Sequence, residues 1–144
     1  MIDEALTAAN SVLNSNITPR GMAASVDGYR EVWARDSMIT LLGAAIAGDQ
    51  EVMSCFRTSL NTLLDNVDRF GQVPYLVTVD EGHLIYGSVD SNPWILIGAA
   101  NYVQLSGDQD WAKRYADTIV RTADWMEAID LRKNGMMQSS ECCD

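Results

Sequence analysis

Two stretches of the chain contain no charged residue and are apolar over nearly their whole length. They cover residues 37–48 (SMITLLGAAIAG) and 93–107 (PWILIGAANYVQLSG). A helix that is apolar all round has no face suited to water, so each stretch predicts an interior helix that is buried on every side.

The residues that follow each uncharged stretch are one-sided. Apolar or small residues recur there at helical spacing, at Val52, Phe56, Leu60, Leu63, Leu64 and Val67, and again at Trp111, Tyr115, Ile119, Thr122, Met126 and Ile129. Charged residues occupy the other positions, which is typical of an outer helix with one buried stripe. Residues 3–14 have a similar one-sided pattern and predict a separate amphipathic helix.

A Gly-Asp-Gln triplet separates the two kinds of helix at residues 48–50 and again at residues 107–109. Glycine is favoured in the left-handed conformation that ends a helix, and aspartate is favoured at the cap of the next one. The repeated unit is therefore an αα-hairpin, found at residues 36–70 and 92–130, and the expected fold class is all-α. The β-branched residues around Pro74 add a short strand or a β-hairpin within residues 71–91.

This connectivity puts the segments that enter the interior helices at one common end. Those segments contain Trp33-Ala34-Arg35-Asp36, residues 89–92 and residues 139–144, and Asp36, Asp90 and Asp144 are spaced 54 residues apart. We therefore expect one acidic, aromatic-lined face.

The Trp33-Ala34-Arg35-Asp36 stretch suits a sugar site. A guanidinium and a carboxylate each form two hydrogen bonds at once, to two adjacent hydroxyls of a sugar, and an indole supports the apolar side of a pyranose ring. The alternative is structural: Asp36 caps a helix that begins at Ser37, and Arg35 pairs with a nearby acid.

The second entry segment has the same two interpretations. Pro93 suits the first helical position, so Asn92 is the expected cap and Asp90 is free for a site. Asp90 could instead hydrogen-bond its own turn, and Trp94 could be core packing. In the third segment, Glu141 and Asp144 are either the paired carboxylates that glycoside hydrolysis needs or an acidic tail.

Composition narrows the function classes. The 144 residues include 20 acidic and 10 basic ones, giving a formal charge of −10, which argues against nucleic acid and anionic membrane partners and leaves neutral substrates. The apolar runs are too short to span a bilayer, the N-terminus is acidic, and three cysteines with two adjacent imply no disulfide framework, so a cytoplasmic location is expected. His83 is the single histidine, and we expect no metal or organic cofactor.

With these segments assembled, the sequence resembles the six-hairpin glycosidases. This is the (α/α)6 toroid shared by glucoamylases, the amylo-α-1,6-glucosidases of glycogen debranching and neutral invertases. The matching stretches follow the family's order at residues 29–36 (YREVWARD), 71–74 (GQVP), 86–91 (YGSVDS) with Trp94, and 107–108 (GD).

The resemblance implies that Arg35 and Asp36 grip sugar hydroxyls beside Trp33, while Tyr86, Asp90 and Trp94 line the same mouth. It also implies that the general acid lies in the third entry segment, where Glu141 and Asp144 stand. The family toroid has six hairpins and its base lies in a later one. Residues 1–144 are therefore expected to be a partial catalytic domain, the first two and a half hairpins, which is inactive alone and self-associates through exposed apolar helix faces.

The function that this implies is hydrolysis of α-glucosidic bonds in a glucan or oligosaccharide, with inversion implied by kinship. Two alternatives stay open: a sucrose-cleaving neutral invertase, and a non-catalytic helical-repeat scaffold whose entry loops bind a protein partner.

Overall fold

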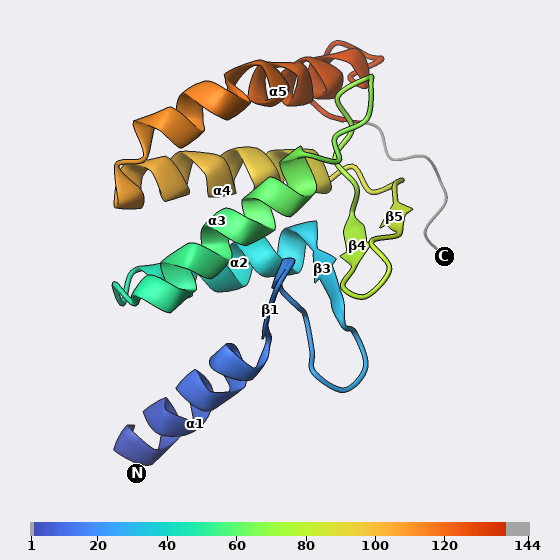
Figure 1. Ribbon diagram of the computed structural model, residues 1–144. Helices are drawn as coiled ribbons and strands as arrows, with labels where there is room; N and C mark the ends of the chain where they lie inside the picture. The colour runs from blue at the N-terminus through green and yellow to red at the C-terminus, as the bar shows by residue number, and fades with distance from the viewer. Residues whose placement is uncertain (1, 138–144) are drawn as a thin grey trace.

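The computed structural model describes residues 2–137 of the chain. Helices dominate this part, and the strands are short (Figure 1). The elements in chain order are α1 (Ile2–Ser15), β1 (Ile17–Thr18), β2 (Gly21–Met22), β3 (Glu31–Trp33), α2 (Ala34–Ala45), α3 (Gln50–Leu64), β4 (Leu76–Thr78), β5 (Leu84–Ile85), α4 (Ser91–Ser106) and α5 (Gln109–Ala128). The all-α prediction is confirmed, and the arrangement is consistent with part of an α/α toroid.

The two αα-hairpins lie side by side, α2 with α3 and α4 with α5 (Figure 1). The helices that follow the uncharged pattern, α2 and α4, pack against each other. Gly98 of α4 allows this close approach, because a β-carbon at that position would collide with the sulfur of Met38 in α2. The core between the helices contains Leu41, Phe56, Leu60 and Ile95, all fully buried.

The predicted boundaries between paired helices are confirmed. Gly48 and Gly107 have left-handed backbone angles, with φ of 75° and 70°. The Asp49 carboxylate accepts hydrogen bonds from the first backbone N–H groups of α3, and the Asp108 carboxylate accepts one from Trp111 in α5. The end of one helix and the start of the next are therefore determined by residues that are close together in the sequence.

The starts of α2 and α4 differ from the prediction. Helix α2 begins at Ala34, three residues early, and its N-cap residue Trp33 makes no capping bond through its side chain. The interpretation of Asp36 as a helix cap is therefore wrong, since it lies inside the first turn. The reason is long-range: strand β3 runs directly into the helix, and the Ala34 N–H donates to the Tyr75 carbonyl at 2.9 Å.

The prediction of Asn92 as the cap of α4 is also wrong. The helix begins at Ser91, and Asn92 is fully buried in its first turn. The Asn92 amide donates to the carbonyls of Gly71 at 2.8 Å and Thr122 at 3.0 Å, and its oxygen accepts from Val73 N–H at 3.0 Å. This side chain therefore ties α4 to α5 and to the loop before β4.

The expected β-hairpin within residues 71–91 is present as β4 and β5. It forms the middle and edge of an antiparallel sheet in the order β3-β4-β5, in which Trp33 pairs with Leu76 and Leu76 with Ile85. The pairing of β3 with β4 and the small β1–β2 ladder were not predicted. Because β3 runs directly into α2, its pairing with β4 holds the start of α2 in place.

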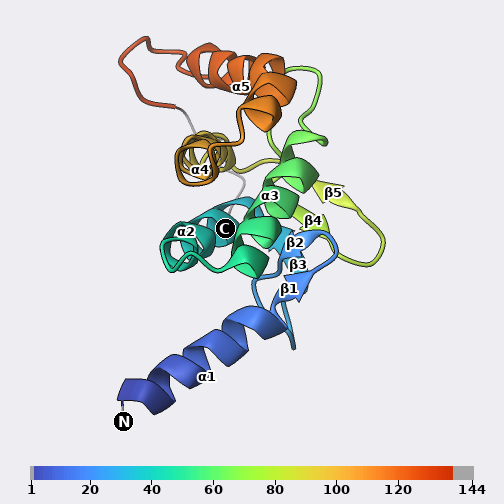
Figure 2. The same cartoon turned by 60° about the vertical axis from the view of Figure 1, so that its left-hand side comes forward.

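The interior helices are not buried on every side within residues 2–137. Ile39 of α2 and Ile97 of α4 are 49% and 44% exposed, because α3 and α5 cover only the opposite sides of this pair. Helix α1 extends away from the other helices in both views, and none of its residues is buried (Figures 1 and 2). Within the described part of the chain, no helix has the length and hydropathy needed to cross a bilayer.

Candidate functional site

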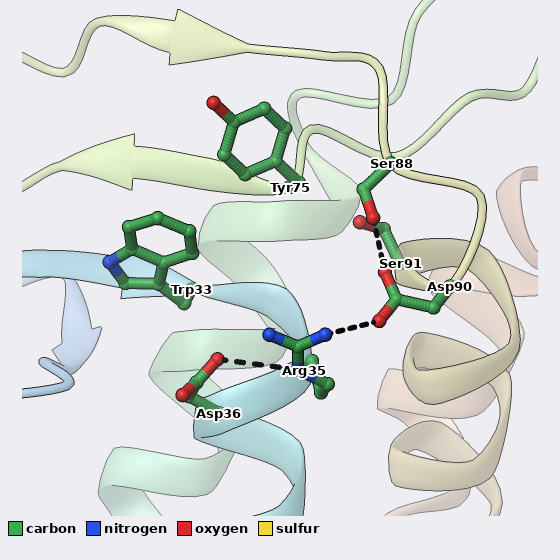
Figure 3. Close-up of a pocket in the computed structure, with 7 residues that line it drawn as sticks. All are labelled: Trp33, Arg35, Asp36, Tyr75, Ser88, Asp90 and Ser91. Carbon is green, nitrogen blue, oxygen red and sulfur yellow. Dashed lines mark hydrogen bonds and ion pairs between the residues drawn. The ribbon is translucent and has the colours of Figure 1, made fainter. Parts of the chain in front are cut away.

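A pocket lies where β3 runs into α2, beside the start of α4. It holds about 40 Å³ and is lined by Trp33, Arg35, Asp36, Tyr75, Ser88, Asp90 and Ser91 (Figure 3). We call these seven residues the rim. The structure thus brings together the entry segments of the two interior helices, as the connectivity predicted, with Trp33, Arg35, Asp36 and Asp90 at one end of the bundle.

The charged groups of the rim form a bridge between α2 and α4. The Arg35 guanidinium lies 2.9 Å from Asp90 Oδ2 through Nη1, and 3.8 Å from Asp36 Oδ2 through Nε. The Ser88 hydroxyl donates to the other oxygen of Asp90. One cation therefore faces two carboxylates, a balance that suits a neutral ligand better than an anion.

These ion pairs are open to exchange with a ligand. The side chains of Arg35, Asp36 and Asp90 are 54%, 45% and 34% exposed. Ion pairs at such exposure contribute only about 0–1 kcal/mol, since water screens them. A ligand hydroxyl can take up the same donors and acceptors at little cost.

Aromatic rings form the other wall of the rim. The Trp33 ring centroid lies 5.5 Å from that of Tyr75 and 6.1 Å from that of Tyr29. The indole N–H donates to Glu31 Oε2 at 3.2 Å, which holds the orientation of the ring. Such a surface supports the apolar side of a ring-shaped ligand, while its polar edge meets the charged bridge.

The space at the rim has two parts that share Trp33, Arg35 and Asp36. The inner pocket of about 40 Å³ has room for water-sized groups. The adjoining depression, which Ala24 and Tyr29 complete, holds about 260 Å³, close to the roughly 300 Å³ at which small-molecule pockets begin. The outer part therefore has room for a ring-sized group, and the inner part has room only for groups of about the size of a hydroxyl.

Two of the predicted rim residues do not line this pocket. The Tyr86 hydroxyl donates to the Asn66 carbonyl at 2.6 Å, and burial, followed by the charge of Asp68, raises the pKa of this phenol. Trp94 is half-buried and packs against the hydrophobic core, the structural alternative that its sequence position left open. Glu141 and Asp144 lie outside the described residues.

Three rim residues were missed as site residues: Tyr75, Ser88 and Ser91. Ser88 and Ser91 flank Asp90 in the 86–91 stretch, so that stretch already contained the signal. Tyr75 comes directly after the 71–74 stretch, but its place beside Trp33 depends on the pairing of β3 with β4.

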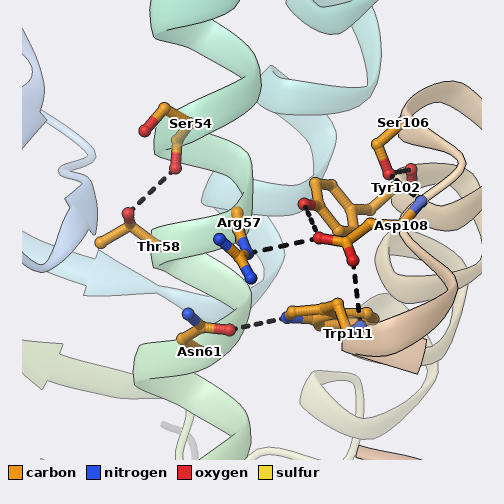
Figure 4. Close-up of polar contacts among 8 residues, drawn as sticks. All are labelled: Ser54, Arg57, Thr58, Asn61, Tyr102, Ser106, Asp108 and Trp111. Atoms are coloured by element: carbon orange, nitrogen blue, oxygen red, sulfur yellow. Dashed lines mark hydrogen bonds and ion pairs between the residues drawn. The ribbon is translucent and has the colours of Figure 1, made fainter. Parts of the chain in front are cut away.

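A separate polar network joins the outer helices at the far end of α4 (Figure 4). Asp108 accepts from the Tyr102 hydroxyl at 3.1 Å and lies 3.5 Å from Arg57, and its bond from the Trp111 backbone lowers the pKa of the carboxyl. The Trp111 indole donates to Asn61 at 2.7 Å. Because α4 has 16 residues, this network lies about 24 Å from the rim and has a structural role.

Two other reactive side chains of residues 2–137, Cys55 and His83, lie apart from the rim. Cys55 is buried in the core, where burial raises the pKa of its thiol to about 11 and removes it as a nucleophile at neutral pH. His83 is exposed and faces Glu81 at 3.2 Å. In residues 2–137, no three histidine, cysteine or acidic side chains come together as a metal site requires.

Comparison with known protein families gives a match over most of the chain. A family model described as amylo-alpha-1,6-glucosidase matches residues 6–135, a span that includes every rim residue. No curated protein and no solved structure matches the chain.

Proposed function

The chain belongs to the amylo-alpha-1,6-glucosidase family, and on that premise we propose that its rim binds the sugar in a glycoside hydrolase that cleaves α-glucosidic bonds. Family membership supports a glycoside hydrolase-like domain. The substrate that we propose is a glucan or oligosaccharide, as in glycogen debranching. The observation that carries the proposal is that Arg35 and Asp36, in the first turn of α2, meet Asp90, the residue just before α4, beside the indole of Trp33.

Each rim group has a role in holding a hexose. The Arg35 guanidinium donates to sugar hydroxyl oxygens, while Asp36 and Asp90 accept from the hydroxyl protons. Trp33 supports the apolar face of the ring, and Ser88 keeps Asp90 in place. Sugar hydroxyls supply both donors and acceptors, so they replace the ion pairs without leaving a charged group unpaired.

Binding and hydrolysis are separate in this proposal. Hydrolysis of a glycosidic bond needs one acid that protonates the leaving oxygen and one base or nucleophile. Asp36 and Asp90 are both engaged with Arg35, which suits positioning of hydroxyls. We propose that Glu141 or Asp144 is the acid, that the base belongs to a later hairpin, and that residues 1–144 alone bind sugar weakly without cleaving it.

The test is a titration of the ¹⁵N-labelled chain with glucose, maltose and sucrose, followed by NMR. We expect glucose and maltose to shift amides around Trp33, Asp36 and Asp90, and Asp36→Ala to weaken that binding about tenfold or more, because an acceptor pair is lost. The matched control is Asp110→Ala, an exposed aspartate of α5 whose side chain, among residues 2–137, pairs only with Lys113. Equal binding by both variants, or no shift at the rim, would contradict the proposal.

Two further readings separate the alternatives. A preference for sucrose over maltose would point to a neutral invertase-like substrate, and absence of any sugar binding would favour the scaffold. Glucose release from a branched glucan by the chain alone would show that the catalytic pair lies within these residues and would overturn the separation of binding from hydrolysis.

A further inference from the structure

The indole ring of Trp33 forms part of the rim, and three neighbours set its orientation. Tyr29 meets the ring edge-on, with 74° between the two ring planes, and Tyr75 meets it at a tilt of 46°. The indole N–H donates to Glu31 Oε2 at 3.2 Å. Two of these contacts are therefore between rings, and the third is a hydrogen bond.

The ring contacts and the hydrogen bond restrict different motions. Packing against Tyr29 and Tyr75 restricts the plane of the indole. The torsion between Cβ and the ring has two broad minima about half a turn apart, and a half turn keeps the plane while it exchanges the two edges. Of the three contacts, only the bond to Glu31 distinguishes these edges, because it needs the N–H. Figure 3 shows the indole nitrogen on the side of the ring away from Arg35.

Glu31 lies next to Trp33 but outside the space for a ligand. It comes two residues before Trp33 in β3, so the two side chains are on the same face of the strand, while Val32 between them is buried on the other face. Glu31 lines neither the inner pocket nor the adjoining depression. Among residues 2–137, its carboxylate bonds only to the Trp33 indole and takes part in no ion pair. Glu31 therefore acts on a ligand at the rim through Trp33.

Without Glu31, a carboxylate of the rim would compete for the indole N–H. A partly buried indole N–H usually has a hydrogen-bond partner. Asp36 lines both parts of the rim space together with Trp33, and its carboxylate lies 3.8 Å from Arg35 Nε, too far for a hydrogen bond. An indole turned towards Asp36 would occupy an acceptor that the proposed function assigns to a sugar hydroxyl. Glu31 thus satisfies the N–H and leaves Asp36 available.

We propose that Glu31 is a positioning residue of the sugar site, which holds the ring face of Trp33 towards the ligand and keeps the indole N–H away from Asp36. The inference rests on the proposed function of the rim and adds to it a residue that does not line the pocket. With its N–H engaged, Trp33 offers the ligand a ring face and no hydrogen-bond donor.

The first readout is the NMR signal of the Trp33 indole N–H in the ¹⁵N-labelled chain, identified by its absence from Trp33→Phe. Glu31→Ala should move this signal, because the N–H loses its charged acceptor. Glu31→Gln, whose side-chain carbonyl still accepts, should largely restore it. Adding Asp36→Asn should move the signal further in Glu31→Ala than in the parent chain, since the indole turns to Asp36 only when Glu31 is removed.

The second readout is the binding of maltose, followed through the rim amides. Glu31→Ala should weaken it about threefold to tenfold, and Glu31→Gln should bind within about twofold of the parent chain. The matched control is Glu81→Ala, which removes an exposed carboxylate from the turn between β4 and β5, where it faces His83 at 3.2 Å. This control should change neither the indole signal nor maltose binding.

The outcomes separate this inference from the proposed function. If the parent chain binds maltose and Glu31→Ala binds it equally well, the positioning role is refuted while the rim stands. An unmoved indole signal in Glu31→Ala, or a loss of binding in Glu31→Gln as large as in Glu31→Ala, also refutes it. Equal effects of Asp36→Asn in the two backgrounds would contradict the competition for the N–H. If maltose shifts no rim amide of the parent chain, the proposed function fails and this inference fails with it.

Discussion

Replacing Asn92 with alanine tests whether one buried amide holds the rim together. Asn92 lies between Ser91 of the rim and the body of α4, and its three hydrogen bonds reach the loop at Gly71 and Val73 and the backbone of α5. That loop leads to Tyr75, on the opposite wall of the rim. The side chain is fully buried, so water cannot take over these bonds without entering the core.

The magnitude follows from these contacts. Each hydrogen bond contributes about 0.5–1.5 kcal/mol net, and the Val73 N–H left buried without a partner adds a penalty of about 1–3 kcal/mol. We expect Asn92→Ala to lower the free energy of unfolding by about 3–5 kcal/mol, a large share of the roughly 5–15 kcal/mol of a typical domain.

The assay is urea unfolding followed by circular dichroism, with Asn101→Ala as the matched control. Asn101 lies in the same helix, but the one bond that its amide donates within the described part of the chain goes to the Ile97 carbonyl, one turn earlier in that helix. Its replacement should change the free energy of unfolding by no more than about 0.5 kcal/mol. A loss below about 1 kcal/mol for Asn92→Ala, or equal losses for both variants, would refute the assignment of Asn92 as the tie between these segments.

Two other predictions concern pH and association. Burial, together with the bond that its hydroxyl donates to Asp65, raises the pKa of Tyr115 to about 12 from an ordinary value of 10.0, so the folded state favours the neutral phenol. The stability that the neutral Tyr115 phenol contributes is complete below pH 10 and is lost as the pH rises towards 12. In urea unfolding across this range, the free energy of unfolding should therefore fall more steeply with pH for the parent chain than for Tyr115→Phe. Equal slopes for the two proteins would refute the raised pKa of Tyr115. The uncharged, exposed positions Ile39 and Ile97 predict that a second copy of the chain packs on α2 and α4. Sedimentation should show that the parent chain associates as its concentration rises. The double variant with Ile39→Glu and Ile97→Glu should abolish this association, whereas Val120→Glu, on the outer helix α5, should leave it unchanged. Identical behaviour of the parent, the double variant and Val120→Glu would argue against this face as the contact.

Much of the fold could be predicted because its causes are local. Uncharged apolar stretches alternate with stretches that have a single apolar stripe. This pattern determines which helices pair in the interior and which lie outside with one face in water. Gly48 with Asp49, and Gly107 with Asp108, end one helix and start the next through backbone conformation and capping bonds within a few residues. That connectivity alone also predicted that the segments around Asp36 and Asp90 lie at the same end.

The details of the site depend on contacts that no local pattern contains. Helix α2 begins at Ala34 because that residue's N–H meets Tyr75, 41 positions along the chain, when β3 pairs with β4. The same pairing brings Tyr75 to Trp33. The packing of the half-buried Trp94 against the core and the bond from Tyr86 to Asn66 direct those two side chains elsewhere. Periodicity and capping act over one or two helical turns, so the sequence by itself determined the helices and their common end. Only the tertiary structure decided which side chains meet there, because that depends on strand pairing and core packing between distant segments.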